Sequence, residues 1–149
     1  MTGRSAQHGT IRLERRYKAS PKRVFAAWAE PEARAKWDVP GRWAIAEQSF
    51  DFRESGRELK RFGPQTDPRF VAETLYLDIV PQRRIVFSYS TTSNGTPISV
   101  SLTTIEMAAD GRETRLLLTE QIVFLDGHDN AGNREEGLSS MLDKIGAML

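Results

Sequence analysis

The stretch NREEGLSSMLDKIGAML, residues 133–149, has the pattern of a long amphipathic helix and decides the fold. Its apolar side chains recur at the spacing of one helix face. Asn133 followed by Glu136 resembles a capping box, so we expect the helix to run from 134 to 149, a length of ~24 Å. One such helix cannot bury its apolar stripe alone, so it must lie on a sheet. The stripe consists of Leu138, Met141, Leu142, Ile145 and Leu149.

The sheet is predicted from residues 43–124, where β-branched and aromatic residues are frequent. Two strong hairpin signals, Asn94-Gly95 and Asp110-Gly111, divide this region. Strands joined by such turns run antiparallel and form a meander with one buried face. The expected strands are 70–80, 84–90, 98–107 and 114–124, preceded by a segment in which Ala44, Ala46, Gln48, Phe50 and Phe52 share one face.

The chain before this sheet has the pattern of a strand followed by two short helices. Apolar and charged side chains alternate over residues 11–18, which is typical of a half-buried strand. Ser20 then supplies an N-cap and Pro21 the first position of a helix, and a second short helix follows Glu30 and ends near Trp37. Residues 1–9 are predicted to be a flexible tail, so residues 10–149 form a single domain.

The composition is that of an ordinary globular protein. Of 149 residues, 39% are hydrophobic and 28% are charged. The chain contains 21 Lys and Arg and 20 Asp and Glu, so its net charge is close to zero. This balance gives no electrostatic case for binding nucleic acid or an anionic membrane. The chain has no cysteine, which excludes disulfides and thiolate chemistry. No secretion signal or membrane span is recognisable, so we expect a cytoplasmic protein.

The order of one strand, two short helices, an antiparallel meander and a long final helix is that of the helix-grip fold. Local patterns add to this order: Glu14-Arg15-Arg16-Tyr17, Ala19-Ser20-Pro21, Val24-Phe25, Ala27-Trp28, Pro31-Glu32, Trp37, Asp51-Phe52-Arg53, Gly56, Asp78 to Pro81, Gly111, Thr114-Arg115-Leu116, Phe124-Leu125-Asp126-Gly127 and Arg134-Glu135-Glu136-Gly137. On these residues the chain resembles the Aha-type proteins, homologues of the activator of heat-shock protein 90 ATPase in the START/polyketide-cyclase (SRPBCC) superfamily. The resemblance spans residues 10–149. It implies an α+β helix-grip domain in which a curved antiparallel sheet wraps around the C-terminal helix.

The resemblance also implies a cavity between the final helix and the sheet. The residues alone leave two interpretations open, because inward-facing aromatic and apolar side chains either line a pocket or fill a core. Gln48 and Glu120 are the polar residues that we expect to orient a ligand there. The candidate cavity residues are Trp37, Gln48, Phe50, Phe52, Tyr76, Phe87, Tyr89, Glu120, Leu138, Met141, Leu142 and Ile145.

Glu120 interrupts an apolar strand face formed by Leu116, Leu118, Ile122 and Phe124. A carboxylate on such a face is costly unless it has hydrogen-bond partners or water. Two alternatives follow. Either Glu120 lies in a solvated cavity, or the strand bulges or frays there and Glu120 reaches bulk solvent.

We predict that the protein binds a small apolar or aromatic molecule, with no catalytic residue and no cofactor. The first alternative is a cyclase-like or hydrolase-like enzyme that uses the cavity carboxylate of Glu120 as general acid and base, although no paired catalytic group accompanies it. The second is an interaction protein that contacts an Hsp90-type chaperone. This role is the least expected, because the Aha proteins of eukaryotes carry an additional amino-terminal domain. The sequence leaves open whether the protein forms a homodimer.

Metal ions are expected to play no part. The loop Asp126-Gly127-His128-Asp129-Asn130 offers oxygen and nitrogen donors, but it lacks calcium-loop spacing and also suits a turn into a helix. Two histidines and no cysteine are too few ligands for a closed zinc site. Adding a chelator should therefore leave the Tm of thermal unfolding unchanged. A large drop in Tm would instead establish the loop around His128 as a metal site.

Overall fold

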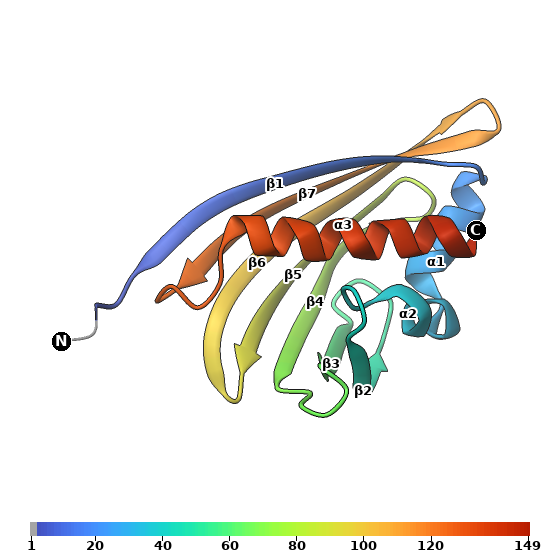
Figure 1. Ribbon diagram of the computed structural model, residues 1–149. Helices are drawn as coiled ribbons and strands as arrows, with labels where there is room; N and C mark the ends of the chain where they lie inside the picture. Colours follow the sequence, from blue (N-terminus) through green and yellow to red (C-terminus); the bar gives the residue numbers. More distant parts are fainter. Residues whose placement is uncertain (1–2) are drawn as a thin grey trace.

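The computed structural model describes residues 3–149 and contains seven strands and three helices within that range (Figure 1). The order matches the expected strand, two short helices, meander and final helix. In chain order the elements are β1 (Ala6–Tyr17), α1 (Pro21–Ala29), α2 (Pro31–Trp37), β2 (Ala44–Phe50), β3 (Arg57–Gly63), β4 (Phe70–Val80), β5 (Arg84–Ser93), β6 (Thr96–Asp110), β7 (Glu113–Leu125) and α3 (Ala131–Met148).

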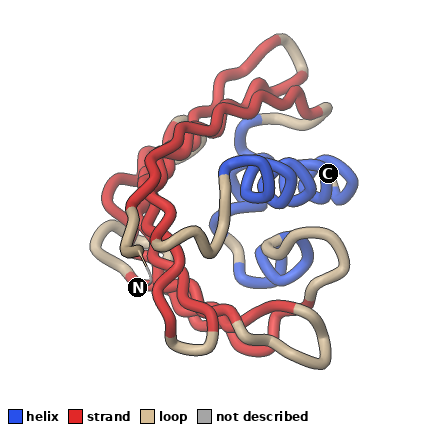
Figure 2. The backbone as a smooth tube through the Cα atoms, turned by 60° about the vertical axis from the view of Figure 1, so that its left-hand side comes forward, coloured by secondary structure: helices blue, strands red, loops and turns tan. Residues whose placement is uncertain are grey.

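The seven strands form one antiparallel sheet in the order β1-β7-β6-β5-β4-β3-β2. The sheet curves into an arc, and all three helices lie on its concave side (Figure 2). The long helix α3 crosses several strands, while α1 and α2 lie beside its C-terminal half (Figure 1). This arrangement confirms the predicted helix-grip fold. Within residues 3–149, no helix combines the length and the apolar character that a membrane span requires.

Both predicted hairpins form, because their turn residues tolerate a left-handed backbone. Asn94 and Gly95 have φ values of 48° and 83°, as a two-residue turn between the paired residues Ser93 and Thr96 requires. At the second hairpin the pair is Asp110 with Glu113. The turn therefore consists of Gly111 and Arg112, one residue later than expected.

The predicted tail is wrong for residues 6–9, because β1 begins at Ala6. The long partner strand β7 extends to Leu125, which pairs with Ala6, and the Ser5 amide donates to Asp126 Oδ1 at 2.8 Å. Backbone pairing thus orders a segment whose polar side chains suggested a loose end. Residues 1 and 2 of the predicted tail lie outside the described residues.

Two further boundaries differ from the prediction. Helix α3 begins at Ala131 rather than 134, because Asn130 has extended backbone angles and its side chain accepts the Asn133 amide at 2.9 Å. Asn133 is thus inside the helix and is not its cap. Strand β2 ends at Phe50, so Phe52 lies in the following loop instead of on the strand. The register of β2 also shifts between Ile45 and Glu47. The Ser20 cap of α1 forms as expected, since its side chain accepts the Arg23 amide.

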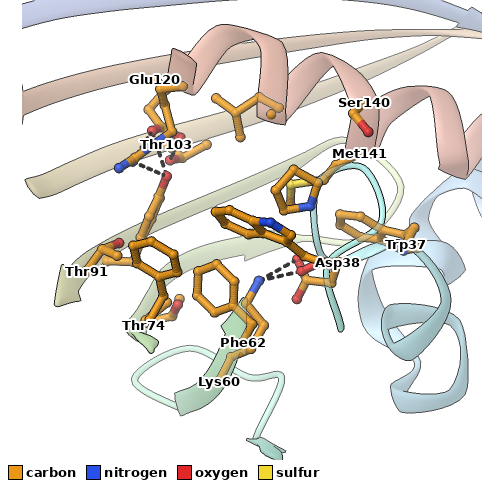
Figure 3. A pocket seen from close by; sticks show the side chains of 18 of the residues that line it. Trp37, Asp38, Lys60, Phe62, Thr74, Thr91, Thr103, Glu120, Ser140 and Met141 are labelled. Atoms are coloured by element: carbon orange, nitrogen blue, oxygen red, sulfur yellow. Dashed lines mark hydrogen bonds and ion pairs between the residues drawn. The ribbon is translucent and has the colours of Figure 1, made fainter. Parts of the chain in front are cut away.

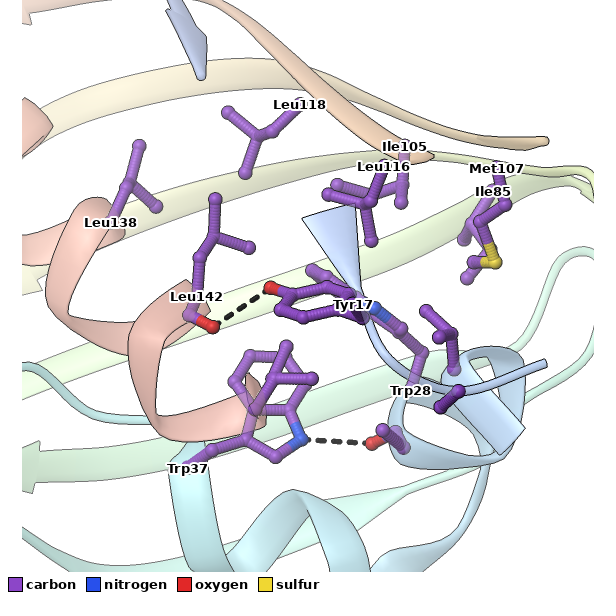
Figure 4. Close-up of a cluster of buried hydrophobic side chains, with 14 of the residues drawn as sticks. Tyr17, Trp28, Trp37, Ile85, Ile105, Met107, Leu116, Leu118, Leu138 and Leu142 are labelled. Atoms are coloured by element: carbon purple, nitrogen blue, oxygen red, sulfur yellow. Dashed lines mark hydrogen bonds between the residues drawn. The ribbon is translucent and has the colours of Figure 1, made fainter. Parts of the chain in front are cut away.

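The core lies under the C-terminal half of α3 (Figure 4). Leu138, Leu142 and Ile145 are buried against inward-facing side chains of the sheet. Tyr17 at the end of β1 donates its hydroxyl to the Leu142 carbonyl at 2.8 Å. Gly146 leaves room for this ring, because a Cβ there would meet it at 3.2 Å. The apolar stripe read from the sequence therefore anchors α3 to the sheet.

Leu142 provides the test of this packing because its side chain is only 1% exposed. Leu142→Ala should lower the free energy of unfolding by about 2–5 kcal/mol in a denaturant titration, since truncating a buried Leu removes contacts and leaves a cavity. The matched control is Leu102→Ala, where the side chain is 40% exposed on the outer face of the sheet. A loss at Leu142 no larger than at Leu102 would contradict the helix-grip packing.

Candidate functional site

A cavity of about 690 Å³ lies between α3, the loop of residues 38–43 and the inner face of strands β3 to β7 (Figure 3). Its walls are mixed. Aromatic and aliphatic side chains alternate with hydroxyl groups, among which Thr74 and Thr91 lie on neighbouring strands. This volume is within the range of pockets that hold drug-sized molecules.

The structure places the twelve candidate cavity residues in two groups. The residues that line the cavity are Trp37, Phe87, Tyr89, Glu120, Leu138, Met141 and Leu142. The other five do not line it. Ile145 packs in the core under the end of α3, and Phe50, Phe52 and Tyr76 pack together beside α1, with 5.0 Å between the ring centroids of Phe52 and Tyr76.

Gln48 also lies outside the cavity, because it faces a buried ion cluster. Its amide Nε2 donates to Asp38 Oδ2 at 3.0 Å and to Glu58 Oε2 at 3.2 Å. Arg34 on α2 occupies the centre of the cluster, and its Nη2 contacts Asp38 Oδ2 at 2.8 Å and Glu58 Oε1 at 2.9 Å. The cluster ties the short helix α2 to strands β2 and β3. We name these residues, together with Lys60 and Tyr76, the Arg34 cluster.

The charges in the Arg34 cluster compensate one another. Burial alone lowers the pKa of Arg34, but the charges of Asp38 and Glu58 outweigh burial and keep the pKa above its ordinary value. Burial likewise raises the pKa of Asp38, and the charges of Arg34 and Lys60 more than offset this, so the carboxylate stays ionised. Tyr76 completes the cluster by donating to Glu58 Oε1 at 2.6 Å. Removing one charged side chain from such a buried group leaves the charge of its partner uncompensated.

Lys60 extends this cluster to the cavity wall. Its ammonium Nζ donates to the Asp38 carbonyl at 2.6 Å, lies 3.2 Å from Asp38 Oδ1, and is 4.7 Å from the ring centroid of Phe62. Figure 3 shows the Lys60 side chain rising from β3 into the pocket with its ammonium beside Asp38. Lys60 is therefore a buried cation that contacts both the ion cluster and the cavity.

Glu120 lies in the opposite part of the cavity and is held by hydroxyl groups. Its carboxylate oxygens accept hydrogen bonds from the hydroxyl groups of Tyr89 at 2.7 Å, Ser101 at 3.0 Å and Thr103 at 2.9 Å. Strand β7 pairs without interruption at this position, and Glu120 is 0% exposed. The predicted alternative of a bulged or frayed strand is therefore wrong. Hydroxyl groups on the neighbouring strands β5 and β6 are the hydrogen-bond partners that the carboxylate requires on this apolar face.

Arg134 on α3 completes this second network, which we name the Glu120 cluster. Its Nη1 lies 3.5 Å from Glu120 Oε2 and donates to the Tyr89 hydroxyl at 3.1 Å, while its Nη2 donates to Ser99 and Asp129. Burial raises the pKa of Tyr89, and the charge of Glu120 raises it further, so the phenol remains protonated and donates. The cluster thus fixes the first turns of α3 over strands β5 to β7.

The loop of residues 38–43 forms the remaining wall and is fastened to α3. The Gly41 amide donates to Ser140 Oγ at 2.9 Å, and Lys144 Nζ donates to the Val39 carbonyl at 2.6 Å. Trp43 at the end of this loop stacks on Phe70 with 5.0 Å between ring centroids and remains 37% exposed. An aromatic group therefore lies at the boundary between cavity and solvent.

Four charged residues at the cavity were not predicted from the sequence, and only two of them, Arg134 and Arg34, have a sequence pattern that indicates an inward position. Arg134 precedes Leu138 and Leu142 by one and two four-residue steps, so helical spacing places it on the inward stripe. Arg34 similarly precedes Trp37 by three residues. Lys60 and Glu58 gave no such signal, because their strand carries Leu59 on the opposite parity and that leucine is exposed. Within residues 3–149, no group of three or more potential metal-ligating side chains forms a metal site.

A curved antiparallel sheet that holds a long C-terminal helix over an internal cavity defines a helix-grip domain of the START type. The family described as "Activator of Hsp90 ATPase homolog 1-like protein" matches residues 18–149, and the chain belongs to this family.

Solved structures from bacteria are similar over nearly the whole chain. An uncharacterized protein from Rhizobium leguminosarum is 38% identical, with a TM-score of 0.89 and coverage of 98% of this chain and 97% of the other. A protein from Rhizobium loti is 44% identical, with a TM-score of 0.89 and coverage of 97% and 99%. An AHSA1 protein from Silicibacter pomeroyi, 18% identical with a TM-score of 0.76 and coverage of 94% and 96%, shares the fold. None of the curated proteins matches the chain.

Glu120→Gln tests whether the Glu120 cluster holds α3 on the sheet. Because the carboxylate accepts several donors and faces the guanidinium of Arg134, its loss should reduce the free energy of unfolding by about 2–3 kcal/mol. Glu14→Gln is the control, since Glu14 pairs with Arg115 on the exposed surface and its loss should change stability little. Chemical denaturation compares the two variants. Equal, small effects would show that the cluster does not stabilise the fold.

Proposed function

We propose that this protein binds a small, mainly apolar ligand in the cavity between α3 and the sheet. The observation that carries the proposal is the cavity of about 690 Å³ under α3. Protein interiors pack densely and contain few voids larger than a water molecule. A space of this size in so small a domain favours an occupant.

The lining supports an amphipathic occupant that is mostly apolar. Trp37, Phe87 and Leu118 offer apolar contact, and Thr74 and Thr91 offer hydroxyl groups in the same lining. Few polar groups on a predominantly apolar surface are typical of sites that orient a small molecule. The two ion clusters occupy separate parts of the wall and hold it in place, which favours a preformed site.

The enzyme alternative has weak support. A general acid or base must reach the proton it transfers. The Glu120 side chain is only 1% exposed, and its carboxylate is already engaged by Tyr89, Ser101, Thr103 and Arg134. A role at an Hsp90-type chaperone, which the family description names, rests on that description alone. Co-purification with the chaperone is its test.

An uncharged fluorescent probe, N-phenyl-1-naphthylamine, tests the proposal. Wild-type protein should bind it saturably with increased probe emission, because the cavity removes the probe from water. Thr74→Phe places a ring in the cavity and should weaken binding at least about tenfold, equivalent to about 1.4 kcal/mol.

Thr104→Phe is the matched control for this substitution. Thr104 follows the buried Thr103 on β6, so its side chain points to the opposite face of the sheet, and it is absent from the cavity lining. The phenylalanine ring introduced there should therefore face outward and leave probe affinity unchanged. Circular dichroism verifies that both variants are folded. No saturable binding by wild type, or equal affinity in both variants, would contradict the proposed site.

A further inference from the structure

The charges around the cavity are unevenly distributed. Near the loop of residues 38–43, the buried charges of Arg34 and Lys60 are balanced by Asp38 and Glu58, and the exposed Arg42 in the same lining adds one further cation. Near the first turns of α3, Arg134 pairs with Glu120 and Asp129, and the lining also includes the exposed Glu136 and the exposed His128. The first end has an excess of positive charge and the second an excess of negative charge. An anionic group on a ligand is therefore favoured at the first end.

Among the cations at the first end, Lys60 has unused hydrogen-bonding capacity. Arg34 uses its three nitrogens on Asp38, Glu58, Tyr76 and the Trp28 carbonyl. The Lys60 ammonium carries three N–H donors, and within residues 3–149 its only oxygen contacts are the carbonyl and Oδ1 of Asp38. One donor is thus left for a further acceptor. Lys60 is also buried at 8% exposure, where a charge-assisted hydrogen bond is strong.

An aromatic ring lies against the same ammonium group and belongs to a cluster of three rings. Phe62 lies beneath Lys60, and its ring centroid is 5.7 Å from that of Phe70, on which Trp43 stacks. All three rings line the cavity. Flat aromatic surfaces next to a cation suit a ligand whose ring system carries an acidic group.

We infer that the cavity is selective for aromatic organic acids, with the acid group accepting a hydrogen bond from Lys60 and the ring system lying along Phe62, Phe70 and Trp43. This inference rests on the proposed function, because it assigns the ligand class of the same cavity. Lys60 acts in it as a binding residue and neither forms nor breaks a covalent bond.

Two probes that share one ring system test the inference. N-phenyl-1-naphthylamine is uncharged, and 8-anilinonaphthalene-1-sulfonate is the same molecule with an added sulfonate. In Lys60→Gln, the Kd of the sulfonate probe should rise about tenfold because the charge is lost, whereas the Kd of the uncharged probe should stay within about twofold. Lys60→Arg, which keeps the charge, should retain at least part of the sulfonate affinity. The control Lys18→Met removes an exposed lysine outside the cavity and should change neither Kd.

A measurement on wild-type protein covers the case in which Lys60→Gln does not fold. In amide NMR spectra, the sulfonate probe should shift the resonances of Lys60 and Asp38 more than the uncharged probe does. Larger sulfonate-specific shifts around Arg134, or an equal loss of both probes in folded Lys60→Gln, would overturn the assignment of Lys60. If wild type binds neither probe, the proposed function itself fails. If it binds both and Lys60→Gln leaves the sulfonate Kd unchanged, the acid-binding inference alone fails.

Discussion

A single helix laid across a strongly curved sheet cannot fill the whole concave face. Close contact is reached only where helix and sheet approach, and in this protein that is the C-terminal half of α3, where Leu142 and Ile145 are buried. The N-terminal half of the helix and the loop of residues 38–43 stand over the remaining concave surface, and the cavity lies beneath them. Core and cavity are therefore two consequences of one packing geometry.

The cavity keeps its shape because charged groups fix its walls. The Arg34 cluster ties α2 and the following loop to strands β2 and β3, and the Glu120 cluster ties the first turns of α3 to strands β5 to β7. A buried charge without its partners is costly, so collapse of either wall into the cavity would have to break paired groups. An apolar lining alone would lack this resistance, since aliphatic side chains repack readily into free space.

The fold was predictable from the sequence because its signals are local. The helical stripe from Leu138 to Ile145, the Asn94-Gly95 turn and the Ser20 cap each act within a few residues and keep their meaning in any context. The start of β1 was not predictable, since its order depends on the length of β7, over a hundred residues away. The predicted shared face along β2 was also wrong, because the register shifts after Ile45 and the strand ends at Phe50, before Phe52.

The site was less predictable than the fold, and charge is the reason. A charged side chain is usually exposed, whereas Arg34, Glu58 and Lys60 are buried. Arg34 pairs with Glu58 and with Asp38, and Asp38 also pairs with Lys60. Their partners are up to 24 residues apart, so no local pattern indicates the pairing. Glu120 was found because it interrupts an apolar strand face, but its hydroxyl partners on β5 and β6 became evident only from the strand register.

A crystal structure of the protein with N-phenyl-1-naphthylamine tests the central claim most directly, namely that the space under α3 is an open binding site. We expect electron density for the probe between α3 and the inner face of the sheet, in contact with Phe87 and Leu118, with both ion clusters intact. Density on the convex face near Leu77 and Leu102, or a cavity closed by the side chains of α3 with no probe inside, would contradict it.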